Sequence, residues 1–205
     1  MKRWGIVGLM LMLALGIAAP GRSQAQGEPK GEAKWQPITV AFHGHSFFVL
    51  QSSKGTRVAI DPHAIIEYGR NPGLKADIIL ISHNHNDHIR TDVIENAKDA
   101  KIIRGLKGAG LKSDWNIVEE TVKDVSIRTV GLYHDDTQGM KSGKVGAFVI
   151  EMDGWKFCHL GDLGHELTPA QIKRIGPLDV VFVPCGGIYT LNGSEAKRVV
   201  DQRPK

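Results

Sequence analysis

The segment ILISHNHNDHIR, residues 79–90, brings three histidines and an aspartate together within six positions. His83 and His85 are two residues apart, so in an extended segment their side chains point the same way. Asp87 and His88 follow directly and can face a second point nearby. Imidazole and carboxylate groups suit zinc, manganese or iron, and two adjacent ligand sets suit a binuclear centre. The alternative is a polar turn in which Asp87 caps a helix, but turns favour Gly, Asn, Ser and Pro over histidine. The cluster therefore predicts a metal site.

Further ligands must come from other parts of the chain. His134 follows the strand-like segment 125–133 at the start of a Gly-rich loop, and Asp162 stands in His159-Leu160-Gly161-Asp162, just past another strand end. A strand-end His or Asp standing alone is more often a hydrogen-bonded turn residue. Ligands that arrive from several strand ends, however, are how a layered α/β scaffold builds a site on one edge. Beside the histidine cluster, both residues become predicted ligands.

The elements that must position these residues are mostly strands. Strand signals are β-branched or aromatic residues bounded by Gly, Pro, Ser and Asp. Asp77 to Ile81, directly before the cluster, is a continuous apolar run that is typical of a strand buried on both faces. The predicted strands are 38–42, 47–51, 56–60, 77–81, 101–103, 116–118, 125–132, 145–152, 155–160 and 179–183.

Three helices are predicted. Residues 89–99 carry apolar side chains at helical spacing. A second helix begins at Thr168-Pro169, a cap followed by proline, and ends before Gly176-Pro177. The third covers 194–202, with Ser194 as its cap and an acidic residue in its first turn. The chain begins with several strands and continues with strands that alternate with helices. This order indicates a layered α/β domain.

The N-terminus reads as a targeting segment. Two basic residues precede an apolar run of about 16 residues, and Ser23-Gln24-Ala25 supplies the small residues of a cleavage site. We therefore expect a signal peptide at 1–25 and export to the periplasm or the exterior; an uncleaved membrane anchor is the alternative. Residues 26–36 are polar and rich in Gly and Pro, which predicts a flexible lead-in, and 37–205 remain for one domain.

Charge and cysteine usage exclude several classes. The formal net charge is +4, but Lys2, Arg3 and Arg22 lie in the leader, which leaves about +1 for the mature chain. No basic block with interleaved aromatics is present, so nucleic-acid binding is not expected. No segment after the leader is apolar for long enough to span a membrane. Cys158 and Cys185 are too few for a disulfide-stapled small domain, and either a bridge or two buried thiols fits.

The order of these motifs resembles the metallo-β-lactamase superfamily: His-x-His-x-Asp-His after an apolar strand, then a single His, then Gly-Asp after another strand. The match is closer to its ascorbate-phosphate lactonase-like branch. That match rests on Gly44-His45-Ser46, Ile60-Asp61-Pro62, ISHNHNDH, HLGDLG, LDVVFVPCGG and Tyr189-Thr190-Leu191, in this order from about residue 38 to the end. The resemblance implies an α/β fold, a four-layer αββα sandwich with two sheets face to face and helices outside.

The resemblance also implies two divalent metal ions, zinc first and manganese or iron as alternatives. One ion would be held by His83, His85 and His134, the second by Asp87 and His88, with Asp162 bridging both. Such a pair generates a metal-bound hydroxide near neutral pH for attack on a carbonyl or phosphoryl centre. Asp87 is also the expected catalytic residue, relaying a proton to the leaving group. The implied function is a metal-dependent hydrolase acting on a small-molecule ester, lactone, amide or phosphodiester.

Other polar residues receive supporting roles. Asp61 matches a family aspartate that orients metal-ligand histidines. For His45, a role behind the ligands and a plain structural hydrogen bond are equally open. His63, His159 and His165 match no ligand position and are expected to pack or to face solvent.

One expected ligand has no match in this sequence. The family supplies a further histidine to the second ion from a strand after the helix 194–202, and the sequence ends at Lys205 before such a strand. We therefore expect a sandwich that is incomplete at its C-terminus and a second metal site of lower affinity. The alternative function is a metal-binding but catalytically impaired, shortened member of the family.

Overall fold

The computed structural model describes residues 37–69, 72–108 and 110–202, so the predicted signal peptide and lead-in lie outside the described residues. The first sheet runs in the order β1-β2-β3-β4-β5. Strands β1 to β3 pair antiparallel, whereas β3, β4 and β5 pair parallel. The five strands are β1 (Thr39–Phe42), β2 (Phe48–Gln51), β3 (Arg57–Ile60), β4 (Ile78–Ile81) and β5 (Lys101–Arg104).

The second sheet runs in the order β12-β11-β10-β9-β8, antiparallel except for the parallel pair of β11 and β12. Its strands are β8 (Glu119–Val122), β9 (Val125–Tyr133), β10 (Lys144–Met152), β11 (Trp155–His159) and β12 (Val180–Phe182). The remaining elements are the β6 (Leu106–Lys107) and β7 (Asp114–Trp115) pair, the 3₁₀ turns η1 (Ile66–Tyr68), η2 (Thr91–Val93) and η3 (Gly110–Lys112), and the helices α1 (Pro169–Ile175) and α2 (Gly193–Asp201).

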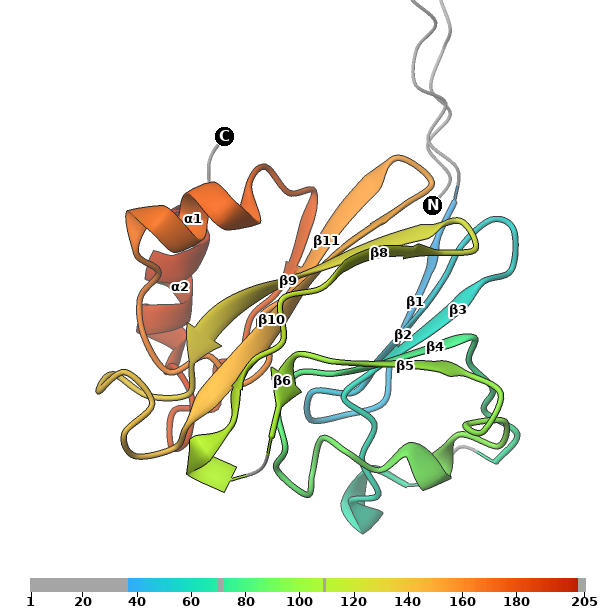
Figure 1. Cartoon of the computed structure of the whole chain (residues 1–205), viewed down its shortest axis with the longest axis horizontal. Helices are drawn as coiled ribbons and strands as arrows, with labels where there is room; N and C mark the ends of the chain where they lie inside the picture. The colour runs from blue at the N-terminus through green and yellow to red at the C-terminus, as the bar shows by residue number, and fades with distance from the viewer. Residues whose placement is uncertain (1–36, 70–71, 109, 203–205) are drawn as a thin grey trace, which may run out of the picture. The chain divides into compact units, whose positions relative to one another are not determined.

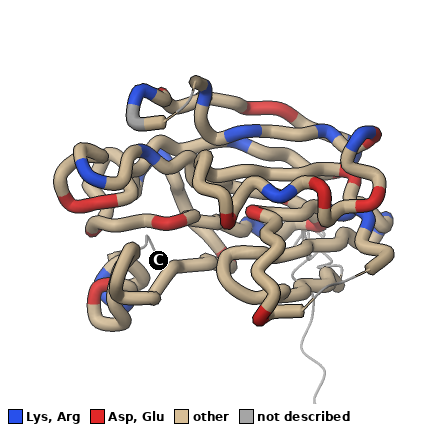
Figure 2. The backbone as a smooth tube through the Cα atoms, turned by 90° about the horizontal axis from the view of Figure 1, so that it is seen from below, with Lys and Arg blue, Asp and Glu red and all other residues tan. Residues whose placement is uncertain are grey.

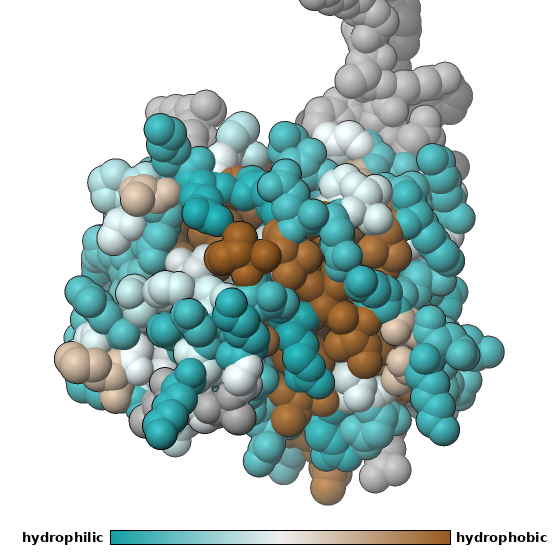
Figure 3. All heavy atoms as spheres, in the orientation of Figure 1, coloured by the Kyte–Doolittle hydropathy of each residue, from teal (hydrophilic) through white to brown (hydrophobic). Residues whose placement is uncertain are grey.

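The two large sheets face each other across the central core (Figure 1). Alternate residues of β3 and β4 point inward, because successive side chains of a strand lie on opposite faces. Ile60 and Leu80 of the first sheet are fully buried in one cluster with Ile127 and Ile150 of the second. Hydrophobic residues form a band on the face seen in Figure 3. The predicted pair of facing sheets is confirmed.

The outer faces are covered differently. Helices α1 and α2 lie over the second sheet (Figure 1), where Ile175 and Val199 pack on residues of β9, β10 and β11. The segment that follows the histidine cluster covers the first sheet, where Ile94 is buried against the outward side chains of β4.

The predicted α-helix at 89–99 is wrong. Only η2 forms there, followed by hydrogen-bonded turns, and Ile94 is already extended. The backbone N–H groups bond to distant segments: Arg90 to the carbonyl of Pro62 and Glu95 to that of Leu74. The Asn96 side chain also bonds both backbone groups of Ala76. Docking on the sheet therefore replaces the helical hydrogen bonds, although the apolar residues face inward as predicted.

The other predicted elements form, with two corrections, and the short strands β6, β7 and β8 were not predicted. Residues 116–118 lie between β7 and β8 and form no strand. Helix α2 is capped by Asn192 and not by Ser194, since the Asn192 side chain accepts from two backbone N–H groups and Glu195 completes the capping box. Thr168 caps α1 as predicted, with Pro169 in the first turn.

Cys158 and Cys185 are both free thiols; Cys158 is buried and Cys185 is exposed, so neither the bridge nor a pair of buried thiols forms. Lys and Arg are interspersed with Asp and Glu along the backbone seen in Figure 2. Within the described part of the chain, no helix is both long and apolar enough to cross a membrane.

Candidate metal centre

Strand ends bring the polar cluster together. The turn 82–88 follows β4, Asp61 follows β3, and His134 follows β9. Asp162 comes just after β11, and His45 stands in the tight turn between β1 and β2. Residues that are far apart in sequence thus meet at one edge of the sandwich, which is where a layered fold builds its sites.

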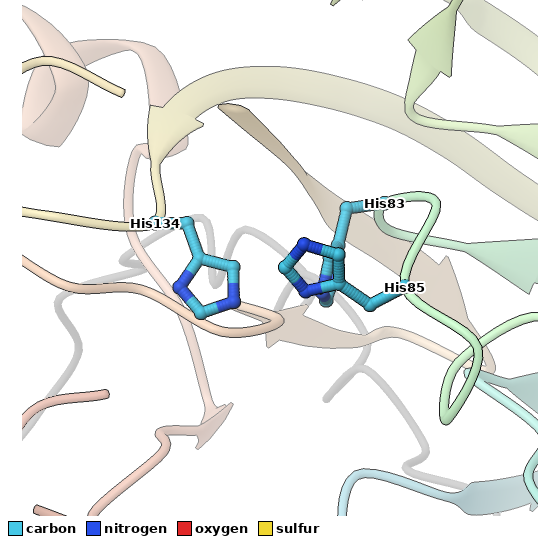
Figure 4. A group of neighbouring side chains, drawn as sticks. All are labelled: His83, His85 and His134. Atoms are coloured by element: carbon cyan, nitrogen blue, oxygen red, sulfur yellow. The ribbon is translucent and has the colours of Figure 1, made fainter. Parts of the chain in front are cut away.

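The first ligand group consists of His83, His85 and His134, whose ligand atoms lie within 4.8 Å of one another. His83 Nε2 and His85 Nδ1 are 3.1 Å apart. Figure 4 shows the two rings projecting from one loop, with His134 facing them from the end of a different strand. Nitrogen ligands around a tetrahedral zinc ion stand about 3.3–3.4 Å apart, given Zn–N bonds of about 2.0–2.1 Å. The spacing of this group therefore fits a cation of zinc's size.

A second group lies beside it. His45, His88 and Asp162 also offer ligand atoms within 4.8 Å of one another. His45 Nε2 stands 3.2 Å from His88 Nε2 and 3.1 Å from a carboxylate oxygen of Asp87. The other Asp87 oxygen is 3.9 Å from His88 Nε2.

Asp162 stands between the two groups. Its Oδ2 atom is 3.3 Å from His88 Nε2, 3.4 Å from His134 Nε2 and 4.0 Å from His83 Nε2. Burial would raise the pKa of Asp162, but hydrogen bonds from His134 and His88 outweigh it and hold the pKa well below its usual range. One ionised oxygen therefore touches both groups, as a bridging ligand must.

Asp61 supports the ligands from behind. It is fully buried, with its Oδ1 accepting from the backbone N–H of Ser82 at 2.7 Å. Its Oδ2 lies 2.6 Å from Ser82 Oγ, 3.1 Å from His88 Nδ1 and 2.9 Å from His159 Nε2. Burial would raise the pKa of Asp61, but the hydrogen bonds from His159 and His88 hold it well below its usual range. With Nδ1 of His88 engaged as a donor, its Nε2 is left to face the second group.

The histidines differ in charge. Burial lowers the pKa of His83 well below its usual value, and the neighbouring His88 adds to the effect, so His83 stays a neutral ligand. Burial would also lower the pKa of His88, but hydrogen bonds to Asp162 and Asp61 raise it to about 10. The carboxylates that favour a proton on His88 would also favour a metal ion at its Nε2, and the metal would displace that proton. The donor set fits divalent metal ions.

Two glycines allow the loops to approach this closely. A Cβ on Gly164 would lie 2.3 Å from the backbone oxygen of His134. Gly161, next to Asp162, has a φ of 54° and would also meet the Ser82 side chain. Gly164 therefore lets the Asp162 loop pack against the His134 loop, and Gly161 lets it pack against Ser82.

All six ligands predicted from sequence lie at this edge: His83, His85, Asp87, His88, His134 and Asp162. For His45 the sequence left a supporting role and a structural hydrogen bond equally open, and it missed the role of His159. His45 stands among the second group, and His159, expected to pack or to face solvent, bonds Asp61. The sequence signals were a histidine in Gly-His-Ser and one at the end of the strand before Gly-Asp, and neither reveals a contact with residues so distant in sequence.

Two further histidines, His63 and His165, have structural hydrogen bonds to the backbone. His63 Nε2 bonds the backbone oxygen of Gly44 at 3.1 Å. His165 Nε2 accepts from the backbone N–H of Tyr133 at 3.2 Å. The further histidine that the family supplies has no counterpart here, since no histidine follows His165 in the sequence.

Comparison with known proteins defines the class. The family model of the β-lactamase superfamily domain matches residues 39–203. This chain belongs to that superfamily, and its two facing sheets have the metallo-β-lactamase fold.

Its relatives narrow the class further. The chain is similar to a UPF0173 metal-dependent hydrolase of Thermococcus onnurineus, 32% identical over 184 residues and covering 80% of this chain and 79% of the relative. A UPF0173 metal-dependent hydrolase of Thermococcus kodakarensis is 30% identical with the same coverage.

Solved structures agree. A candidate Zn-dependent hydrolase of the metallo-β-lactamase superfamily from Thermotoga maritima is 35% identical, with a TM-score of 0.57 over 80% of this chain and 70% of that one. A candidate metal-dependent hydrolase from Parabacteroides distasonis is 19% identical, with a TM-score of 0.60 over 80% and 76%, and shows the fold alone.

Proposed function

We propose that this chain is a hydrolase that holds two divalent metal ions, zinc first and manganese or iron as alternatives. His83, His85 and His134 would hold one ion, Asp87 and His88 the other, with Asp162 between them. The observation that carries the proposal is the position of Asp162 Oδ2, 3.3 Å from His88 Nε2 and 3.4 Å from His134 Nε2. When bound, the ions would supply activation of a water molecule and stabilisation of charge on the substrate oxygen.

The protein's own residues would orient the ligand ring of His88 and pass a proton to the leaving group. Asp61 keeps the His88 ring turned with Nε2 toward the site, since its Oδ2 lies 3.1 Å from His88 Nδ1. Asp87 is partly exposed, at 45% of its side-chain surface, and lines the cleft above the ligands. A carboxylate there can pass a proton to a leaving group that reaches the cleft.

The cleft indicates the kind of substrate. It has a volume of about 750 Å³, a size suited to a small molecule. Phe42, Phe48, Tyr68, Ile188 and Tyr189 line it beside the ligand residues. We therefore propose a small ester, lactone, amide or phosphodiester with an apolar part, the lactone being favoured by the resemblance to the ascorbate-phosphate lactonase-like branch. The sequence of residues 1–25 supports the further proposal that the protein is exported.

The test is metal content measured together with hydrolysis. Purified full-length protein should contain two equivalents of metal and hydrolyse at least one member of an ester, lactone, amide and phosphodiester panel, with loss of turnover in a chelator. His83→Ala should lower turnover by more than about 100-fold, because even residues behind metal ligands typically cost 10–100-fold. Asn86→Ala is the matched control, since Asn86 is exposed within the same loop.

The outcomes separate the alternatives. Bound metal without turnover on the whole panel would instead support the metal-binding, catalytically impaired protein. No bound metal, or equal turnover in wild type and His83→Ala, would refute the proposal.

A further inference from the structure

His45 stands where a ligand of the second ion would stand. Its Nε2 atom is 3.2 Å from His88 Nε2 and 3.1 Å from Asp87 Oδ2. These separations are close to the roughly 3.3–3.4 Å expected between ligand atoms around a tetrahedral zinc ion. The side chain is only partly exposed, at 29%, and borders the substrate cleft.

The backbone of the β1–β2 turn is bent to aim this ring. His45 has a φ of 52°, a left-handed conformation that non-glycine residues rarely adopt. The preceding Gly44 has a φ of 88°, and a Cβ there would lie 2.3 Å from the Tyr68 ring. Backbone bonds between His43 and Phe47, and between Phe47 and Gly44, close the turn. Strain of this kind persists where the surrounding structure holds it and concentrates at functional sites.

Neighbouring rings hold the imidazole in place. His45 packs edge-on against His63 with centroids 5.9 Å apart, and His63 in turn is tied to the backbone oxygen of Gly44. The centroid of the His45 ring also lies 4.9 Å from that of the His88 ring. The fold therefore positions the His45 ring, and its Nε2 is directed at the Asp87 carboxylate.

We infer that His45 is a direct ligand of the second metal ion, completing a set with Asp87, His88 and Asp162. The inference rests on the two-ion function proposed above. It assigns the Gly44-His45-Ser46 turn to the metal centre, in place of a supporting or purely structural role for this histidine.

His45→Gly is the test variant, because glycine removes the imidazole and accepts the positive φ without strain. Full-length protein would be titrated with Co²⁺ while visible absorption and metal stoichiometry are recorded. Wild type should bind two equivalents. His45→Gly should keep the first site, lose at least about tenfold in affinity at the second and show altered second-site absorption. Free imidazole should restore that affinity, which a merely structural role would not allow.

Controls keep the two proposals apart. Asn86→Ala should match wild type, and thermal unfolding without metal should show that His45→Gly is folded. Wild type that binds two ions, with His45→Gly binding both at unchanged affinity, overturns the assignment of His45 and leaves the proposed function standing. Wild type that binds one ion or none overturns both.

Discussion

Replacing Asp61 by asparagine removes the charge behind the metal centre while keeping the size of the side chain. The carboxylate accepts from the backbone N–H and the hydroxyl of Ser82, from His88 and from His159. An amide keeps only one accepting oxygen. If that oxygen stays where Oδ2 now accepts from the Ser82 hydroxyl, His88 and His159, the NH₂ group takes the place of Oδ1. The Ser82 N–H, which now donates to Oδ1, then faces another donor in a fully buried site.

Two effects follow from this change. His88, whose pKa is raised to about 10 partly by Asp61, loses a buried counter-charge. Removing one partner of a buried ion pair typically costs about 3–5 kcal/mol of unfolding free energy. At about 2–4 °C per kcal/mol for a chain of this size, the metal-free protein should melt about 6–20 °C lower. The ligand rings also lose their anchor, so metal affinity should fall about 10–100-fold.

The assay combines thermal unfolding of the metal-free protein with competition against a chromophoric chelator. Asp77→Asn is the matched control, because Asp77 also accepts a backbone N–H, from Arg57 at 2.8 Å, but lies at the opposite end of β4. It should leave metal affinity unchanged. An Asp61→Asn protein that folds and binds both ions within twofold of wild type would refute the anchoring role of Asp61.

The remaining predictions concern the thiols and the α2 cap. Burial raises the pKa of Cys158 to about 12, so a thiol reagent at pH 8 should label only Cys185 in the native protein and both residues in urea; two native labels would contradict the burial. Because the folded thiol holds its proton after the unfolded thiol has lost it, this group's contribution to stability should fall as pH rises from about 9 to 12, by up to about 1.4 kcal/mol per unit. In urea titrations at several pH values, the free energy of unfolding of Cys158→Ala should lack this decrease with pH. Asn192→Ala should cost about 1 kcal/mol in urea unfolding, whereas Ser194→Ala should not; equal losses would argue against the cap.

Local sequence patterns predicted the strands that carry the site. Ile78 to Ile81 is apolar throughout, and β4 is buried on both faces as such a run requires. Thr168-Pro169 marked the start of α1 because the cap and the proline act within one turn. The same local logic failed at 89–99, since spacing records which residues face inward but not whether the N–H groups bond within the segment or to Pro62 and Leu74.

The sequence by itself determined the chemistry of the centre: histidine and aspartate in a spacing suited to metal, placed directly after apolar strands. Only the tertiary structure decided which of these side chains meet. Asp61 meets His159 across 98 positions, and His45 meets His88 across 43. Such contacts depend on how the turn between β1 and β2 and the ends of β3, β4 and β11 meet at one edge. That arrangement follows from packing two sheets around a common core, and no short stretch of sequence contains it.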